Sequence, residues 1–308
     1  MTGGDEFLDV APGDARWGHG TGPGADGVQL HFVRRGSGPA VVLLHGWPGF
    51  WYDWRRVIPL LAPEADLIAP DLRGFGDSDK PDRPPDEAYT PPALAADVFA
   101  LLDHLGVGEV TLAAHDIGAT VAQAMALGAP ARVRSMALFN PPYLGIGERR
   151  FEYSAQRELW YQYLHTMPWS DELVGHSRDT VRIYLAHFYD HWVGRKETVR
   201  PAEFEAIVDT YARPGAIRGG FNYYRARFLA RRSEAALDPR HFQIPQPTVI
   251  LWGEEDPVIP VAWADRLQES FPNSTLQTLP GVGHFVPFEA PDEVTDAIRD
   301  ALRRAGRA

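Results

Sequence analysis

The sequence contains no cysteine. This absence excludes disulfide bonds, thiolate nucleophiles, and zinc or iron–sulfur sites built on cysteine. Basic residues are also in short supply, because 30 lysines and arginines stand against 41 aspartates and glutamates, for a formal net charge of −11. An acidic chain repels the phosphates of nucleic acids. We therefore expect neither thiol chemistry nor nucleic-acid binding.

Long apolar runs are missing as well. No stretch approaches the roughly 20 residues of a membrane-spanning helix. The first six residues, Met1 to Glu6, contain neither the basic nor the apolar region of a secretory signal. We therefore expect a soluble cytoplasmic protein without a membrane partner. The oligomeric state stays open, a homodimer included.

The length of the chain leaves two domain organisations open. At about 150 residues per domain, 308 residues correspond to two domains, or to one large domain with an insertion. Hydrophobic residues make up 44% of the chain, which is enough for a large core. Composition alone does not choose between the two organisations.

Short, continuously apolar runs recur along the chain, separated by helical patterns. Continuous apolarity is typical of strands buried on both faces of a parallel sheet. Between two of these runs, apolar residues recur at helical spacing from Leu94 to Leu105, after Thr90-Pro91 and before Gly106. The alternation predicts an α/β fold with a doubly wound, mostly parallel sheet. The predicted strands are Val41–Leu44, Leu67–Ala69, Val110–Ala114, Met136–Phe139 and Thr248–Trp252.

The alternation stops between about residues 143 and 238. This stretch is rich in aromatic residues, follows helical patterns and contains no convincing strand. We therefore favour the insertion over two tandem domains. The predicted core comprises residues 1–142 and 239–308, and the predicted helical cap comprises residues 143–238.

Asp116 occupies the most informative short segment, Ala113 to Ala119. Here a predicted strand meets a predicted helix, with small residues on both sides. This is the context of a nucleophile elbow, a strained turn that presents one side chain above the carboxyl end of a sheet. The presented residue is aspartate rather than serine. This segment alone is equally compatible with an ordinary aspartate that caps the following helix.

Three further segments favour the elbow. His45-Gly46-Trp47-Pro48 follows a predicted strand, so a backbone N–H of this turn could form an oxyanion hole with the N–H of Ile117. Asp256 lies in an acidic loop after the last predicted strand, and His284 lies in a glycine-flanked loop. Nucleophile, acid and base then follow the chain order that is typical of α/β-hydrolases.

These motifs resemble the α/β-hydrolase superfamily over nearly the whole chain, and within it the epoxide hydrolase branch, which includes haloalkane and haloacid dehalogenases. His45-Gly46-Trp47-Pro48 looks like the His-Gly-x-Pro oxyanion segment of that branch, and the turn from Asp71 to Ser78 is similar to its Asp-x-Arg-Gly-x-Gly-x-Ser turn. His115–Gly118 resembles the elbow with an aspartate nucleophile. The resemblance implies an α/β-hydrolase fold with an inserted helical cap. It also implies hydrolysis of a small hydrophobic epoxide to a vicinal diol, without a metal or an organic cofactor.

An aspartate nucleophile restricts the chemistry. Its ordinary pKa is about 3.9, so it is anionic at neutral pH and attacks without help from a base. Displacement at a saturated carbon would give an ester between Asp116 and the substrate. His284, oriented by Asp256, would then activate the water that hydrolyses the ester. The N–H groups of Trp47 and Ile117 would bind the resulting oxyanion.

Opening an epoxide also requires a donor for the ring oxygen. The resemblance matches Tyr161 and Tyr224 in the predicted cap to the two tyrosines that serve this purpose in the family. Aromatic residues in a helical cap are often packing residues instead. Tyr153, Tyr163 and His165 lie close to Tyr161 in the sequence, so the choice of this donor stays open.

Two alternative functions are kept. A dehalogenase could use the same aspartate, but haloalkane dehalogenases resembling this chain carry Trp at the position of Ile117. Haloacid-type members carry Arg at the positions of Ile117 and Thr120. The second alternative is a non-catalytic, ligand-binding protein of the same fold. It predicts loss of a catalytic residue, whereas Asp116, Asp256 and His284 are all present.

Overall fold

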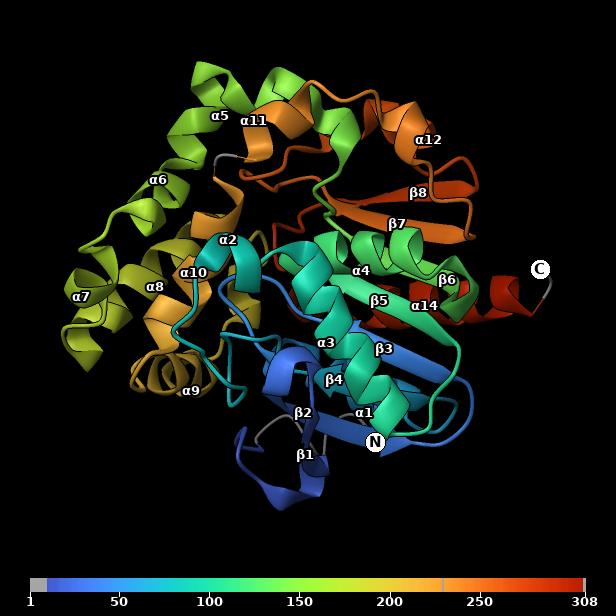
Figure 1. Ribbon diagram of the computed structural model, residues 1–308, viewed down its shortest axis with the longest axis horizontal. Coiled ribbons are helices and arrows are strands. Elements are labelled where there is room, and N and C mark those ends of the chain that lie inside the picture. Colours follow the sequence, from blue (N-terminus) through green and yellow to red (C-terminus); the bar gives the residue numbers. More distant parts are fainter. Residues whose placement is uncertain (1–9, 229, 307–308) are drawn as a thin grey trace.

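The computed structural model describes residues 10–228 and 230–306, so the first six residues considered above lie outside the described part (Figure 1). The described residues contain one eight-stranded sheet with the order β1-β2-β4-β3-β5-β6-β7-β8. All neighbours from β4 to β8 are parallel, whereas β1 and β2 run antiparallel at one edge. The strands are β1 His19–Pro23, β2 Gln29–Gly36, β3 Ala40–Leu44, β4 Asp66–Pro70, β5 Val110–His115, β6 Val133–Phe139, β7 Thr248–Gly253 and β8 Ser274–Leu279.

The five predicted strands are the five consecutive strands from β4 to β7, and the predicted α/β class is confirmed. Strands β5 and β7 are buried at every position, which matches their unbroken apolar sequences. The sequence patterns missed β1, β2 and β8. These strands lie toward the two edges of the sheet, where polar and exposed residues weaken the apolar signal.

Helices cover both faces of the sheet. In Figure 1, α3 (Pro91–His104) and α4 (Ile117–Gly128) lie in front of the strands, and α14 (Pro291–Ala305) lies behind them. Helix α1 (Val57–Leu61) packs against α14 on the same rear face. The predicted start of α3 is confirmed, because the Thr90 side chain accepts a hydrogen bond from Ala93 N at 3.3 Å.

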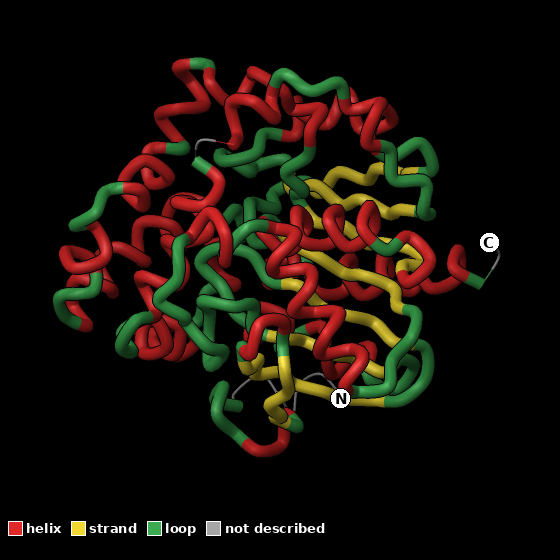
Figure 2. Tube along the Cα trace, in the orientation of Figure 1, coloured by secondary structure: helices red, strands yellow, loops and turns green. Residues whose placement is uncertain are grey.

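The chain between β6 and β7 forms helices and loops within its described residues (Figure 2). This agrees with the predicted helical insertion, while its boundaries at residues 143 and 238 stay a prediction. It begins with the 3₁₀ segment η6 (Leu144–Phe151). Its helices are α5 Tyr153–Glu158, α6 Trp160–Thr166, α7 Ser170–Val174, α8 Arg178–Trp192, α9 Pro201–Tyr211, α10 Ala216–Arg227 and α11 Ala230–Ala235; the remaining helices of the chain are α2 Pro85–Ala88, α12 Leu267–Ser270 and α13 Val286–Glu289.

Buried polar contacts attach this helical segment to the sheet domain. Glu203 of α9 accepts hydrogen bonds from Arg55 at 2.9 Å and Arg56 at 2.8 Å. Tyr189 of α8 donates to the carbonyl oxygen of Pro48 at 3.0 Å. Because each contact ends on the segment between β3 and α1, these helices are held over the loop that follows β3.

Two glycines bring α10 unusually close to the sheet domain. A Cβ atom at Gly219 would lie 2.1 Å from the carbonyl oxygen of Gly74, and one at Gly220 would lie 2.5 Å from the Trp47 ring. Glycine within a helix costs about 0.5–1 kcal/mol relative to alanine. The close approach explains the glycine pair and fixes the position of Tyr224, one turn further along α10.

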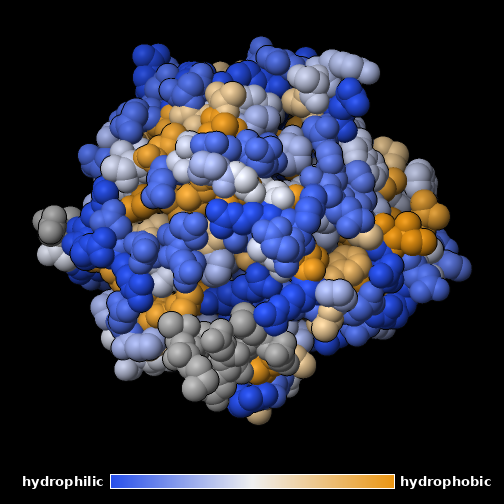
Figure 3. All heavy atoms as spheres, turned by 180° about the vertical axis from the view of Figure 1, so that it is seen from behind, coloured by the Kyte–Doolittle hydropathy of each residue, from blue (hydrophilic) through white to orange (hydrophobic). Residues whose placement is uncertain are grey.

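The rear surface of the molecule is mixed in character. In Figure 3, polar residues surround smaller apolar groups on this face. No helix among the described residues has both the length and the apolar character needed to cross a membrane. The cytoplasmic location stays a prediction.

A buried ion pair connects α3 to the loop after β4 and offers a test of the fold. Arg73 and Asp97 are almost inaccessible, with side-chain exposures of 0% and 1%, and approach to 2.6 Å. We expect Asp97→Asn to lower the free energy of unfolding by about 3–5 kcal/mol, because it leaves a buried guanidinium without its counterion. Urea denaturation measures the change.

The matched control is Glu64→Gln, which removes a half-exposed partner of Arg299. Its effect should stay within about 1 kcal/mol, as for other surface pairs. Equal losses in the two variants would contradict the role assigned to the buried pair.

Candidate active site

Asp116 lies in a strained turn between β5 and α4. Its backbone angles are φ 46° and ψ −115°, which L-residues rarely adopt. Its side chain makes no capping hydrogen bond to α4, so the helix-cap alternative does not describe it. A Cβ atom at Gly118 would lie 2.3 Å from the carbonyl oxygen of Leu44, and one at Gly46 would lie 2.7 Å from the Cβ of Asp116. The small neighbours therefore allow this turn to pack against the loop after β3.

The Asp116 carboxylate faces backbone N–H groups. Trp47 N donates to Asp116 Oδ2 at 3.0 Å, and the side chain of Asp116 is only 12% exposed. Burial raises the pKa of Asp116, while nearby His284 and the N–H groups of Trp47 and Ile117 act in the opposite direction. The two predicted oxyanion N–H groups thus both lie at this carboxylate.

His284 lies between two carboxylates. Its Nδ1 is 2.9 Å from Asp256 Oδ2, and its Nε2 is 4.0 Å from Asp116 Oδ2. Nε2 is buried and has no hydrogen-bond partner among the described residues. Burial acts to lower the pKa of His284, but Asp256 and Asp116 together raise it above its ordinary value. Asp256 therefore holds the imidazole through Nδ1, and Nε2 lies on the side of Asp116.

Asp256 is fixed by three groups besides His284. The backbone N–H groups of Val258 and Ile259 donate to Oδ1 at 2.7 and 3.0 Å, and Asn140 Nδ2 donates to Oδ2 at 2.6 Å. Asn140 directly follows β6, has a φ of 42°, and accepts a hydrogen bond from Gly253 N. Sequence analysis missed Asn140, although its position at the carboxyl end of a buried strand was a usable signal.

Glu289 was also missed. Its Oε2 accepts hydrogen bonds from the backbone N–H groups of Gly194, Arg195 and Gly283 at 2.8–3.0 Å. Its Oε1 accepts one from Phe285 N at 3.1 Å. One buried carboxylate thus holds the loop that carries His284 against the end of α8. An acidic residue five positions after the histidine was the only sequence signal.

The remaining residues of the oxyanion segment shape its backbone. His45 Nδ1 lies 3.0 Å from the carbonyl oxygen of Gly46, and His45 Nε2 accepts a hydrogen bond from Leu72 N at 3.0 Å. The peptide bond between Trp47 and Pro48 is cis. The Trp47 indole is fully buried among aromatic rings, so this residue faces Asp116 through its backbone rather than its side chain.

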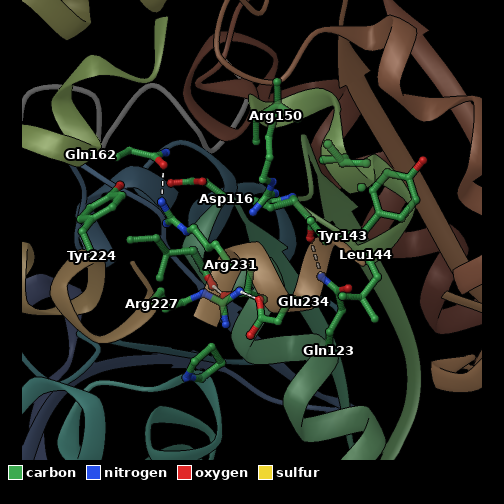
Figure 4. Close-up of a pocket in the computed structure, with 18 of the residues that line it drawn as sticks. Asp116, Gln123, Tyr143, Leu144, Arg150, Gln162, Tyr224, Arg227, Arg231 and Glu234 are labelled. Carbon is green, nitrogen blue, oxygen red and sulfur yellow. Dashed lines mark hydrogen bonds and ion pairs between the residues drawn. The ribbon is translucent and has the colours of Figure 1, made fainter. Parts of the chain in front are cut away.

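Tyr161 and Tyr224 line a cavity of about 650 Å³ together with Asp116 and Ile117. Figure 4 shows Tyr224 and Asp116 in this cavity. The two tyrosine rings are 5.6 Å apart and nearly perpendicular. Gln162 Nε2 donates to the Tyr161 hydroxyl oxygen at 3.0 Å. Burial raises the pKa of both tyrosines, and the Asp116 charge adds to this rise. Both hydroxyls therefore stay protonated at neutral pH.

The alternative donors near Tyr161 are placed less favourably. Tyr153 is 82% exposed, and Tyr163 is 42% exposed although it also lines the cavity. His165 Nε2 is hydrogen-bonded to the Tyr184 hydroxyl at 2.6 Å, and the His165 ring stacks on Phe221. Among Tyr153, Tyr161, Tyr163 and His165, Tyr161 is the residue that is both buried and part of the cavity wall, which favours it as the donor.

One group of residues has the composition of a metal site. In the described part of the chain, ligand atoms of His31, Asp71 and Asp77 lie within 4.8 Å of one another. However, His31 Nδ1 is 2.8 Å from Asp71 Oδ2, and Asp71 Oδ1 accepts a hydrogen bond from Trp51 N. His31 and Asp71 thus bind each other, the Asp77 carboxylate is paired with Arg213, and none of the three residues lines the cavity with Asp116.

The interaction between His284 and Asp256 predicts a measurable titration. We expect the pKa of His284 to lie above 6.5 in the wild-type protein and to fall in Asp256→Asn, because burial then outweighs the remaining carboxylate. NMR of the imidazole C–H signals, assigned with His284→Gln, measures both values. Glu254→Gln changes an exposed carboxylate of the same loop and should leave the pKa of His284 in place. An unchanged pKa in Asp256→Asn would refute the coupling.

Comparison with known proteins agrees with this geometry. Residues 39–291 match the family model described as the alpha/beta hydrolase fold. The soluble epoxide hydrolase of Corynebacterium sp. (strain C12) is 34% identical over 284 residues, covering 88% of this chain and 92% of that protein. A fluoroacetate dehalogenase of Burkholderia sp is 32% identical over 279 residues, covering 86% and 88%. The solved structure of epoxide hydrolase CorEH without ligand has a TM-score of 0.80 and 30% identity, over 92% of this chain and 98% of that chain. The chain therefore belongs to the α/β-hydrolase family and, within it, to the epoxide hydrolase-like branch.

Proposed function

We propose that this chain is an epoxide hydrolase that converts a hydrophobic epoxide to a vicinal diol through a covalent ester of Asp116. One observation carries the proposal: the cavity that is lined by Asp116 is also lined by Tyr161 and Tyr224. A nucleophile and two proton donors are the groups that opening an epoxide needs. The relatives named as epoxide hydrolases support the same reaction.

In the first step, a carboxylate oxygen of Asp116 attacks an epoxide carbon and the carbon–oxygen bond of the ring breaks. Oδ2 accepts the hydrogen bond from Trp47 N, which favours the other oxygen as the nucleophile. The ring oxygen takes a proton from Tyr161 or Tyr224 and remains hydrogen-bonded to the second hydroxyl. Gln162 donates a hydrogen bond to the Tyr161 oxygen, so the single proton of this hydroxyl is not used in that contact. The proton is therefore available to the ring oxygen.

In the second step, His284 Nε2 takes a proton from water, and the resulting hydroxide attacks the carbonyl carbon of the ester. The N–H groups of Trp47 and Ile117 stabilise the oxyanion. When this intermediate collapses, the alkoxide of the diol leaves and takes the proton from His284. Asp116 is left as a carboxylic acid that holds the second proton of the water. Transfer of this proton to the phenolate of the donor tyrosine restores both groups. A water oxygen thus remains in the Asp116 carboxylate.

Dehalogenation by the same aspartate is the second candidate, favoured by the relative named fluoroacetate dehalogenase. The positions where haloacid-type members carry arginine are Ile117 and Thr120 in this chain. Thr120 Oγ1 is hydrogen-bonded to the carbonyl oxygen of Ile117 and to the Tyr223 hydroxyl, both at 2.8 Å. Ile117 and Thr120 carry no positive charge to bind the carboxylate of a haloacid, and the Thr120 hydroxyl is already hydrogen-bonded within the protein. Both points favour an epoxide over a haloacid. Diol and halide release measured on matched substrates separate the two functions.

Oxygen labelling tests the ester. With enzyme in excess and water enriched in oxygen-18, a single turnover should place the label in Asp116 and little of it in the first diol. Mass spectrometry of the diol and of the peptide containing Asp116 measures both. His284→Gln should accumulate the ester, because it removes the base but not the nucleophile. Label that enters the first diol directly would exclude the covalent route.

Replacing the two tyrosines tests the ring-opening donors. Tyr161→Phe combined with Tyr224→Phe should slow formation of the ester about 10²–10⁴-fold, the usual contribution of general acids. The control is Tyr223→Phe, which changes the neighbouring tyrosine whose hydroxyl is bonded to Thr120. Pre-steady-state quenching with a terminal epoxide measures the rate. A double variant as fast as the control would show that other groups protonate the ring oxygen.

A further inference from the structure

The cavity that contains Asp116 has a second charged region. Apart from Asp116, the charged residues that line it are Arg150, Arg227, Arg231 and Glu234. Three guanidinium groups therefore share the cavity with two carboxylates, Asp116 and Glu234 (Figure 4). This excess of positive charge stands in a chain with a formal net charge of −11.

The three arginines differ in their partners. Arg227 is paired with Glu234, whereas Arg231 donates to the neutral amide oxygen of Gln162. The guanidinium of Arg150 has no hydrogen-bond or ion-pair partner within residues 10–228 and 230–306. Two of the three cations thus lack an anionic partner.

This arrangement is costly without an anion. Burial, Arg231 and Arg227 lower the pKa of Arg150 to about 10, while Glu234 opposes the change. Arg150 therefore stays charged at neutral pH, close to two other cations. A ligand carboxylate would relieve the repulsion, and the planar guanidinium binds a carboxylate through two parallel hydrogen bonds.

The arginines come from other elements of the chain than the nucleophile. Arg150 belongs to η6, Arg227 to α10 and Arg231 to α11, whereas Asp116 precedes α4. Arg231 lies over the Tyr224 ring, 5.4 Å from its centroid, so the arginine cluster borders the tyrosine pair. The cavity wall also includes apolar side chains, namely Leu144, Ile146, Phe151, Leu159 and Phe228. An apolar segment of the ligand therefore fits in the same cavity as the charged groups.

From this we infer that the substrate is an epoxide that also bears a carboxylate, with an apolar chain separating the two groups. Asp116 attacks the epoxide while Arg150, assisted by Arg231, binds the carboxylate in the same cavity. The inference rests on the proposed epoxide hydrolase activity and specifies its substrate class. Its anion site differs from the positions of Ile117 and Thr120, which in haloacid-type enzymes would hold a carboxylate beside the nucleophile.

Matched substrates test the inference. We expect 10,11-epoxyundecanoate to be hydrolysed with a kcat/KM about 10- to 100-fold higher than its methyl ester, the effect of a charge-assisted hydrogen bond, mainly through KM. Arg150→Gln should abolish this preference and leave turnover of the ester unchanged. Arg150→Lys should retain part of it, because the charge remains. The control is Arg232→Gln, on α11 but outside the cavity, over the Phe151 ring.

Binding without turnover provides a second measurement. Calorimetry with octanoate and 1-octanol should show tighter binding of octanoate to the wild-type protein and equal binding of the two to Arg150→Gln. An ester hydrolysed as efficiently as the acid, or a preference that survives in Arg150→Gln, would overturn the anion site and leave the epoxide hydrolase activity intact. If no epoxide is hydrolysed, the proposed function fails. Octanoate binding that depends on Arg150 would then uphold the anion site, and its absence would refute it.

Discussion

The site depends on one backbone constraint, the strained turn at Asp116. A non-glycine residue with φ of 46° and ψ of −115° costs of order 1–3 kcal/mol and persists only where its surroundings enforce it. Here Gly118 lies against β3 and Gly46 lies against Asp116 itself. The turn and the loop after β3 therefore pack too closely for a side chain at either glycine. A larger residue at either glycine would separate the carboxylate from the Trp47 N–H. The strain and the geometry of the site therefore have the same origin.

Keeping charged groups buried in this site requires many hydrogen-bond donors, and backbone N–H groups supply most of them. Asp116 faces the N–H of Trp47, and Asp256 accepts two backbone hydrogen bonds and one from Asn140. Glu289 accepts four backbone hydrogen bonds. An unpaired buried carboxylate would become protonated instead. These fixed donors explain how His284 is held between two acids although it is almost completely buried.

The sequence was sufficient to predict the main residues of the candidate site, but not the residues that hold them in place. Each inner strand contains a continuous apolar run, so β3 to β7 were predictable, and the elbow and the loops after β3 and β7 followed from them. The edge strands β1 and β8 are polar and exposed, and their pairing depends on neighbours that the local sequence does not specify. Asn140 holds Asp256 and Glu289 holds Gly194, and each of these pairs is more than 90 positions apart in the sequence. Local sequence patterns do not reveal such contacts.

The charged lining of the cavity illustrates the same limit. The chain contains many arginines, and the sequence around each of the three in the cavity is typical of a solvent-exposed helix face. These three are Arg150, Arg227 and Arg231. They meet because η6 and α11 pack together while α10 is pressed onto the sheet domain through Gly219 and Gly220. Arg231 then reaches Gln162, whose amide orients the Tyr161 hydroxyl. The contact that holds one cation in the cavity thus also orients the hydroxyl of a proposed proton donor, so the proposed anion site and the proposed ring-opening site are physically connected.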